Sequence, residues 1–254
     1  TTPDWEKREK IADCVFGVTC TREGLDELRR LSPDPSRVGL VYHGLDLSRF
    51  PAPPARPPRD GRDPADPLRI VTIGRAVAKK GFDDLLDALA RLPRDVHWRL
   101  TQIGGGELRD ALRRQAEALG IAANVVFAGA KPQSEVIEAL RAADLFVLPC
   151  KEGDASDRDG LPNVIMEAAT QGLAILSTNF AGVPEFVTDG ENGRLVPPRD
   201  PAALAEAIAG LAADPALRIR LGAAARHRIE TDFSFRSGVA EIAGRLRRAM
   251  DAAS

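Results

Sequence analysis

The sequence of 254 residues lacks the cysteine and histidine patterns that stabilise secreted or metal-bound domains. No C-x-x-C pair occurs, and the three cysteines are Cys14, Cys20 and Cys150. Three cysteines at these spacings fit neither a disulfide framework nor a zinc site. The three histidines are also scattered, at His43, His97 and His227. We therefore expect no bound metal, and a reducing cytoplasm is the setting that the composition favours.

Long apolar runs and an excess of positive charge are also absent. No apolar run approaches the roughly 20 residues of a membrane-spanning helix, and no secretory signal opens the chain. Basic and acidic residues nearly balance, 35 against 37, for a formal net charge of -2. Without an overall positive field the chain would not attract nucleic acid. We expect neither a transmembrane protein nor a nucleic-acid-binding protein.

What the chain does contain is enough apolar material for a core, since 44% of its residues are hydrophobic. Short strand-like runs occupy residues 68–73, 97–103, 124–128, 144–148, 173–177 and 193–196. Helix-like segments separate the first five of them, near residues 81–92, 107–119, 132–142 and 162–171. Strands that alternate with helices predict an α/β fold, in which helices cover both faces of a parallel sheet.

The residues before this pattern are too few to fold alone. Runs 11–18 and 38–42 are typical of short buried strands, and between them lies a predicted helix with Thr21 as its N-cap. Two strands and a helix do not make a core. We therefore expect residues 1–46 to be the C-terminal remnant of a domain that is largely absent from this chain.

Three further segments complete the expected organisation. Residues 47–67 are rich in Pro, Arg and Asp, which predicts a linker without a core of its own. Residues 68–232 form the expected Rossmann-like domain. Residues 233–254 form a last amphipathic helix, which we expect to cross back to the missing N-terminal domain.

Fixed cations follow the first strand of the predicted sheet. Right-handed crossovers bring every strand-to-helix loop to one edge of a parallel sheet, where ligands bind. The first loop runs from Gly74 to Gly81 and carries Arg75 and Lys80. The guanidinium fork and the ammonium point charge suit a diphosphate. The spacing does not match a P-loop, and a solvated basic loop is the alternative.

The loops after the second and third strands carry weaker signals. Gly104-Gly105-Gly106 does not match the G-x-G-x-x-G dinucleotide signature, so a tight turn explains it as well as a ligand does. The loop that contains Lys131 could contact a base edge through its backbone, and a plain loop explains it equally well.

The loop after the fourth strand is the most informative. Pro162 is suited to be a first helical residue, which leaves the amides of Asn163 and Val164 to bind phosphate at a helix N-terminus. Glu167, on the second turn, could accept two hydrogen bonds from a ribose diol. Asp159, just before the helix, could bind sugar hydroxyls.

Taken in order, these motifs resemble the family 4 retaining glycosyltransferases of the GT-B fold. The resemblance covers roughly residues 11–250. Its motifs are His43-Gly44-Leu45-Asp46, Gly74-Arg75 to Lys80-Gly81, Asp159 to Glu167, Gly182-Val183-Pro184-Glu185 and Asp189-Gly190-Glu191-Asn192-Gly193. The Asp-Gly-Leu-Pro-Asn-Val form of the fourth loop is most similar to the exopolysaccharide, colanic-acid-type branch.

The resemblance implies a role for each of these residues. The two acids of the family's E-x7-E motif fall on Asp159, for the donor sugar, and Glu167, for the ribose; the base is held largely by backbone near Lys131. The implied catalytic residues are Arg75, Lys80 and Asp159. The implied donor-binding residues are Gly74, Lys131, Leu161, Asn163, Val164 and Glu167. Two departures are an Asp in place of the first Glu, and Pro162 in place of a common glycine, which removes one N–H.

The function that the resemblance implies is transfer of a sugar, with retention, from a UDP- or GDP-sugar donor without a metal or other cofactor. The acceptor would be a saccharide or a lipid-linked saccharide, in cell-surface polysaccharide or glycolipid synthesis. Because the acceptor site belongs mainly to the N-terminal domain, we expect this chain alone to bind donor and to transfer poorly. The expected location is cytoplasmic. The Arg-rich last helix leaves peripheral membrane contact as an alternative to a solvated face.

Other functions remain open at this point. A nucleotide-sugar-binding module without catalysis is favoured by Asp159 and Pro162. A related sugar-nucleotide epimerase would need additional acid and base residues, and a phosphorylase often needs a cofactor lysine; neither is evident in the sequence.

Overall fold

The structure is a computed structural model that describes residues 3–153 and 160–253, and its chain divides into two compact units. The larger unit comprises Ser48–Arg228. The smaller unit joins the residues up to Leu47 with those from Ile229 onward.

The larger unit is built on six parallel strands in the order β5-β4-β3-β6-β7-β8. Their bounds are β3 Leu68–Ile73, β4 Trp98–Ile103, β5 Val125–Gly129, β6 Leu145–Leu148, β7 Ala174–Thr178 and β8 Arg194–Val196. The central strands β6 and β7 are buried along their whole length. A parallel sheet covered on both faces has such continuous apolar strands, so the predicted fold class is confirmed.

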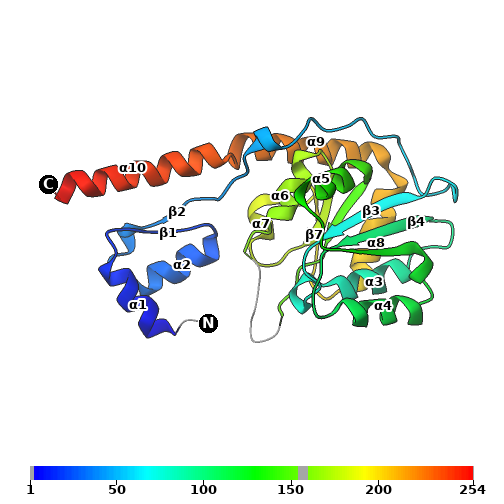
Figure 1. Cartoon of the computed structure of the whole chain (residues 1–254), viewed down its shortest axis with the longest axis horizontal. Helices are drawn as coiled ribbons and strands as arrows, with labels where there is room; N and C mark the ends of the chain where they lie inside the picture. Colours follow the sequence, from blue (N-terminus) through cyan, green and yellow to red (C-terminus); the bar gives the residue numbers. More distant parts are fainter. Residues whose placement is uncertain (1–2, 154–159, 254) are drawn as a thin grey trace. The chain divides into compact units, whose positions relative to one another are not determined.

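Helices cover both faces of this sheet, with α3 and α4 on one face and α5 and α6 on the other (Figure 1). The helices of the unit are α3 Phe82–Ala90, α4 Arg109–Ala118, α5 Gln133–Ala142, α6 Asn163–Thr170, α7 Val183–Phe186, α8 Pro201–Ala213 and α9 Pro215–Asp232, the last of which runs on into the smaller unit. Short 3-10 helices lie at Leu47–Arg49, Ala78–Lys80 and Ala122–Asn124.

The predicted linker packs on the larger unit through arginine side chains. The guanidinium of Arg56 donates to three main-chain oxygens, those of Leu140, Ala143 and Gln171, at 2.8–3.2 Å. Arg59 pairs with the buried carboxylate of Asp144 at 3.0 Å. Buried carbonyl oxygens need donors, so the arginines of this segment hold it on the unit by polar contacts.

The smaller unit contains a parallel pair of strands, β1 Gly17–Thr19 and β2 Val38–Leu40. Its helices are α1 Asp4–Asp13, α2 Arg22–Leu31, the 3-10 turn Pro35–Arg37 and α10 Phe235–Ala253. The Thr21 hydroxyl accepts from the Gly24 amide at 3.1 Å, which confirms the predicted N-cap. The rings of Tyr42 and Phe233 are 5.0 Å apart, so the residues before α10 pack on the N-terminal segment.

The expected strand over residues 11–18 is wrong, because residues 11–13 end helix α1 and pairing begins only at Gly17. Helix α1 carries acidic side chains in its first turn and a basic one in its last turn, a distribution that suits the helix dipole. Glu6 and Lys10 form an i,i+4 ion pair at 2.5 Å, which adds to helix stability.

Across the residues that the structure describes, no helix combines the length and the apolar character that crossing a membrane requires.

Candidate functional site

The candidate site lies where the strand order changes direction, between β3 and β6. In open α/β sheets ligands bind outside the carboxyl ends of the strands at this switch point. The loops after β3 and β6 meet there, since the Lys151 amide donates to the Lys79 carbonyl oxygen at 3.0 Å. A Cβ on Gly81 would lie 1.9 Å from the Pro149 carbonyl oxygen, so only glycine allows the two backbones to approach so closely.

The loop after β3 presents the two predicted cations. Arg75 is exposed, and Lys80 is half-buried at the end of the 3-10 helix Ala78–Lys80. The aliphatic stem of Lys80 lies over Gly74, where an added Cβ would be 3.3 Å from Lys80 Cε. Because Gly74 has no side chain, the stem of Lys80 can pack against its backbone.

The three glycines after β4 pack their backbone against the loop that carries Arg75 and Lys80. A Cβ on Gly104 would lie 2.0 Å from the Gly74 oxygen, and one on Gly106 would lie 2.5 Å from the Ala76 oxygen. The Ala76 amide also donates to the Gly105 oxygen at 2.7 Å. These contacts favour the tight-turn interpretation of the glycine run, because its backbone is packed against the cationic loop.

The loop after β6 leads into helix α6 at the same edge of the sheet. The prediction that Pro162 is the first helical residue is wrong, because Pro162 is the N-cap, with φ -68° and ψ 123°, and the helix begins at Asn163. A proline restricts its predecessor, not its successor, to extended backbone, so the helix can start directly after it. The Asn163 and Val164 amides still open the helix, as predicted. Leu161 is buried, with 5% exposure, and anchors the loop in the core.

Glu167 is half-buried on the second turn of α6, and desolvation by burial raises the pKa of its carboxyl. Gln133 Nε2 lies 3.4 Å from Glu167 Oε1, and the charge of Arg49 also acts on this carboxyl and lowers its pKa. Sequence analysis missed Gln133 and Arg49. Gln133 is the first residue of helix α5, just after the predicted loop at Lys131. Because residues at that edge of the sheet can reach the site, its position could have indicated a contact.

The Lys131 side chain is exposed and pairs at 2.7 Å with Glu135, four residues later in the first turn of helix α5. This pair leaves the main chain of the loop, rather than the ammonium, as the part suited to contact a base. Asp159, the predicted sugar contact, lies outside the described residues.

A buried lysine was also missed. The Lys151 side chain is 7% exposed, and its ammonium contacts Asp83 Oδ2 at 2.6 Å and Asp84 Oδ2 at 3.1 Å. Its place three residues after the end of a buried strand was the available signal. Nothing in the local sequence indicates its partners, because both lie on helix α3. Asp83 precedes Lys151 by 68 residues.

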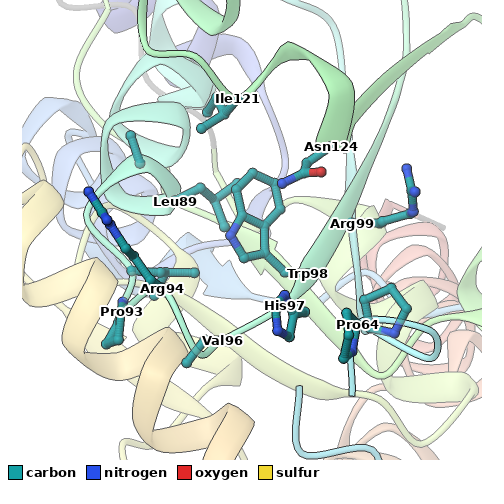
Figure 2. Close-up of a pocket in the computed structure, with 13 residues that line it drawn as sticks. Pro64, Leu89, Pro93, Arg94, Val96, His97, Trp98, Arg99, Ile121 and Asn124 are labelled. Atoms are coloured by element: carbon teal, nitrogen blue, oxygen red, sulfur yellow. The ribbon is translucent and has the colours of Figure 1, made fainter. Parts of the chain in front are cut away.

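A cavity of about 310 Å³ lies at the opposite edge of the sheet, near the amino ends of β4 and β5. Figure 2 shows the Trp98 indole there, beside Leu89 and Asn124. Arg94 and Arg99 also line the cavity, at an edge where helix α3 ends and its carbonyl dipoles favour cations. None of the predicted site residues lines this cavity, so it is separate from the candidate site.

Within residues 3–153 and 160–253, no group of three or more His, Cys, Asp or Glu side chains is placed to hold a metal ion.

Comparison with known sequences decides the family, because residues 58–228 match the family described as Glycosyl transferases group 1. The chain belongs to this family. The matched range contains every residue of the candidate site except Arg49, and it covers the sheet from β3 to β8.

Curated relatives of this group 1 chain have specific names. The GDP-mannose-dependent alpha-(1-6)-phosphatidylinositol monomannoside mannosyltransferase of Mycolicibacterium smegmatis is 35% identical over 205 residues, which are 79% of this chain and 53% of the relative. The putative colanic acid biosynthesis glycosyltransferase WcaL of Escherichia coli is 29% identical over 235 residues, 92% of this chain and 56% of the relative. The chain thus spans about half the length of these relatives.

Solved structures show the same fold. The structure of Anabaena HepE in complex with UDP and glucose superposes with a TM-score of 0.80 at 20% identity, over 97% of this chain and 68% of that one. Sucrose-phosphate synthase from Thermosynechococcus elongatus gives 0.81 at 27% identity, over 99% and 62%. These likenesses confirm a fold of the GT-B glycosyltransferase type.

Proposed function

We propose that this chain supplies the donor-binding half of a retaining glycosyltransferase that takes its sugar from a nucleoside diphosphate sugar. The observation that carries the proposal is the meeting of two loops at the switch point of the sheet. One loop brings Arg75 and Lys80, and the other leads to the amides at the start of α6. Cations and helix N-terminal amides that converge at one sheet edge suit a diphosphate.

The chemistry follows from where charge develops. As the bond between the anomeric carbon and the diphosphate breaks, negative charge builds on the leaving phosphate and the sugar becomes oxocarbenium-like. Arg75, Lys80 and the Asn163 and Val164 amides lie ready to stabilise that charge, and preorganised donors of this kind lower the barrier. The proposal names no covalent nucleophile and uses front-face attack by the acceptor, which retains the configuration.

The remaining donor contacts divide between ribose, base and sugar. Glu167, oriented by Gln133, accepts hydrogen bonds from the ribose diol. The main chain near Lys131 contacts the base. Asp159 binds the sugar hydroxyls. Because Arg75, Lys80 and the amides supply the positive charge, donor binding needs no divalent cation, and EDTA should leave it unchanged.

The names of the relatives support a class of donor and a class of acceptor for the proposed reaction. One relative is called GDP-mannose-dependent, and the Anabaena structure contains UDP, so UDP- and GDP-sugars are the proposed donors. Relatives named for phosphatidylinositol mannoside, lipopolysaccharide core and colanic acid synthesis support a saccharide or lipid-linked acceptor. A cytoplasmic enzyme at the inner face of the plasma membrane, acting in surface polysaccharide or glycolipid synthesis, would meet both substrates.

The test is sugar transfer by the full-length protein that contains this chain, compared with its Arg75→Ala and Lys80→Ala variants. Removal of one preorganised donor typically costs about 10²–10³ in rate, so each variant should lose that much activity. Exposed Arg62→Ala, outside the site, is the matched control for loss of an arginine. If both site variants keep full activity, the proposed mechanism is wrong.

A second candidate, a nucleotide-sugar-binding module without catalysis, is favoured by Pro162, which offers no N–H at the cap of α6. The same assay separates the two functions. A module would bind donor with Arg75 and Lys80 intact but would show neither transfer nor donor hydrolysis in the full-length protein.

A further inference from the structure

Lys151 forms a buried ion cluster that the proposed donor contacts do not use. Its ammonium lies between the carboxylates of Asp83 and Asp84, at 2.6 and 3.1 Å. Asp84 is also mostly buried, with 14% of its side chain exposed, whereas Asp83 is 49% exposed. Two charged groups leave water at a considerable cost. A buried lysine with two acids is therefore a specific arrangement rather than a surface ion pair.

The cluster stands beside the proposed diphosphate site. Asp83 and Asp84 lie in the first turn of α3, which begins two residues after Lys80. Lys151 follows β6 on the other side of the switch point, and its amide binds the Lys79 oxygen. The cluster thus joins the segment that carries the phosphate-binding lysine to the loop that leads toward α6.

Neighbouring contacts hold the Lys151 backbone in place. The hydroxyls of Ser177 and Thr178, at the end of β7, donate to the Leu148 and Cys150 oxygens. A guanidinium nitrogen of Arg199 donates to the Glu152 oxygen at 2.7 Å, and the Arg199 charge also acts on Asp84. The main chain on both sides of Lys151 is consequently held, which keeps the base of its side chain beside the two acids.

The negative charges of Asp83 and Asp84 would affect a diphosphate bound beside them. Two carboxylates beside a diphosphate would repel it, because like charges at short range in a low-dielectric crevice raise the free energy. Without Lys151, two uncompensated acids would follow directly on the loop that carries Arg75 and Lys80. With Lys151 in place, Asp83 and Asp84 have a partner of their own.

We propose that Lys151 is a positioning residue for the donor diphosphate. It acts through Asp83 and Asp84, whose negative charge it offsets beside the loop after β3. This inference rests on the proposed donor-binding function.

The experiment is calorimetric titration of the 254-residue chain with UDP and with GDP, for four proteins. These are the unsubstituted chain, Lys151→Met, Lys151→Arg and the triple variant Lys151→Met/Asp83→Asn/Asp84→Asn. Lys151→Met should weaken diphosphate binding on the order of tenfold, the effect of one charge at roughly 12 Å for an effective dielectric near 20. The triple variant should recover the affinity, because the acids are neutral. Lys151→Arg should retain most of it.

Recovery in the triple variant separates this role from a structural one, since lost packing is not restored by removing two more charges. The proposal is overturned if Lys151→Met binds as tightly as the unsubstituted chain, or if the triple variant stays as weak as Lys151→Met. Should Lys151→Met fail to fold, Asp83→Asn/Asp84→Asn decides instead: it keeps Lys151 without its acids and should bind more tightly, and equal or weaker binding overturns the proposal. Absence of binding by the unsubstituted chain would instead contradict the donor-binding function itself.

Discussion

Glu167 combines burial with a carboxyl group that has few partners in the structure. Its carboxyl contacts Gln133 at 3.4 Å and is desolvated by the surrounding helix and loop. A ribose diol would supply the hydrogen bonds that water can no longer supply. The residue therefore has the properties of a binding group whose ionised form costs the fold stability.

The pKa of Glu167 gives a prediction about stability. Desolvation raises its pKa above the ordinary value of 4.5, so the folded chain holds this proton more tightly than the unfolded chain does. The resulting stabilisation is complete below pH 4.5 and is lost as the pH rises through the folded pKa. Glu167→Gln stays neutral, so it should unfold at a higher temperature than the unsubstituted chain at pH 8, and the gap should close toward pH 4.

Thermal unfolding from pH 4 to pH 8 measures this gap. Exposed Glu117→Gln on helix α4 is the matched control and should show no such pH-dependent gain. A gap for Glu167→Gln that does not change with pH would show that the ionised carboxylate costs the fold nothing.

Among the site residues, the sequence was sufficient where the signal is local. The position of Arg75 and Lys80 at the carboxyl end of β3 was predictable, because they follow a buried strand within a loop bounded by glycines; their role stays a prediction. The Lys151 cluster and the Gln133 contact were not predictable, because a buried lysine or a contact with Glu167 depends on which distant segments the sheet brings together. Only the folded structure shows which distant segments meet; the residue types alone do not.

At the scale of elements, the junction of the two loops depends on Gly81. Gly81 has a left-handed φ of 64°, and an added Cβ would meet the Pro149 oxygen at 1.9 Å. Gly120 has a similar φ of 71° but no atom within 4 Å of its would-be Cβ. Comparing the two glycines separates backbone strain from the clash.

Gly81→Ala should therefore destabilise the chain much more than Gly120→Ala. The positive φ alone costs about 1 kcal/mol, which is the loss expected for Gly120→Ala. Gly81→Ala adds displacement of the Pro149 backbone and should lose roughly 2–4 kcal/mol. Urea unfolding of both variants measures the difference, and equal losses would mean that the two loops do not depend on this close approach.

Strands and helices of the larger unit were largely predictable, and the exceptions have physical causes. Buried parallel strands are short apolar runs bounded by glycines and charges, so β3 to β8 lie within a residue or two of their expected bounds. Helix α7 has only four residues, too few for a periodic signal. Helix α1 buries none of its residues, so charge pairs rather than apolar periodicity identify it.

At the scale of the whole molecule, arginine determines how the segment before the sheet is held. Composition predicted a linker without a core, and the structure shows why such a segment is still ordered: the Arg56 guanidinium binds three main-chain oxygens of the larger unit. Low complexity predicts the absence of apolar packing, but it does not exclude polar anchoring.

The two units also differ in which functional residues they contain. The larger unit contains the six-stranded sheet and the candidate site, whereas the described part of the smaller unit contains the parallel pair β1 and β2. Because the chain spans about half the length of its curated relatives, we propose that acceptor binding belongs to the remainder of the protein. The account of this chain therefore depends on donor binding alone.

Calorimetric titration of the chain with UDP, GDP and ADP, in the presence of EDTA, tests that claim most directly. The account predicts that at least one of these diphosphates binds with a stoichiometry of one. It further predicts that Arg75→Ala and Lys80→Met each weaken this binding at least tenfold, as loss of a charge-assisted phosphate contact should. Absence of binding by all three, or binding that neither substitution weakens, would contradict it.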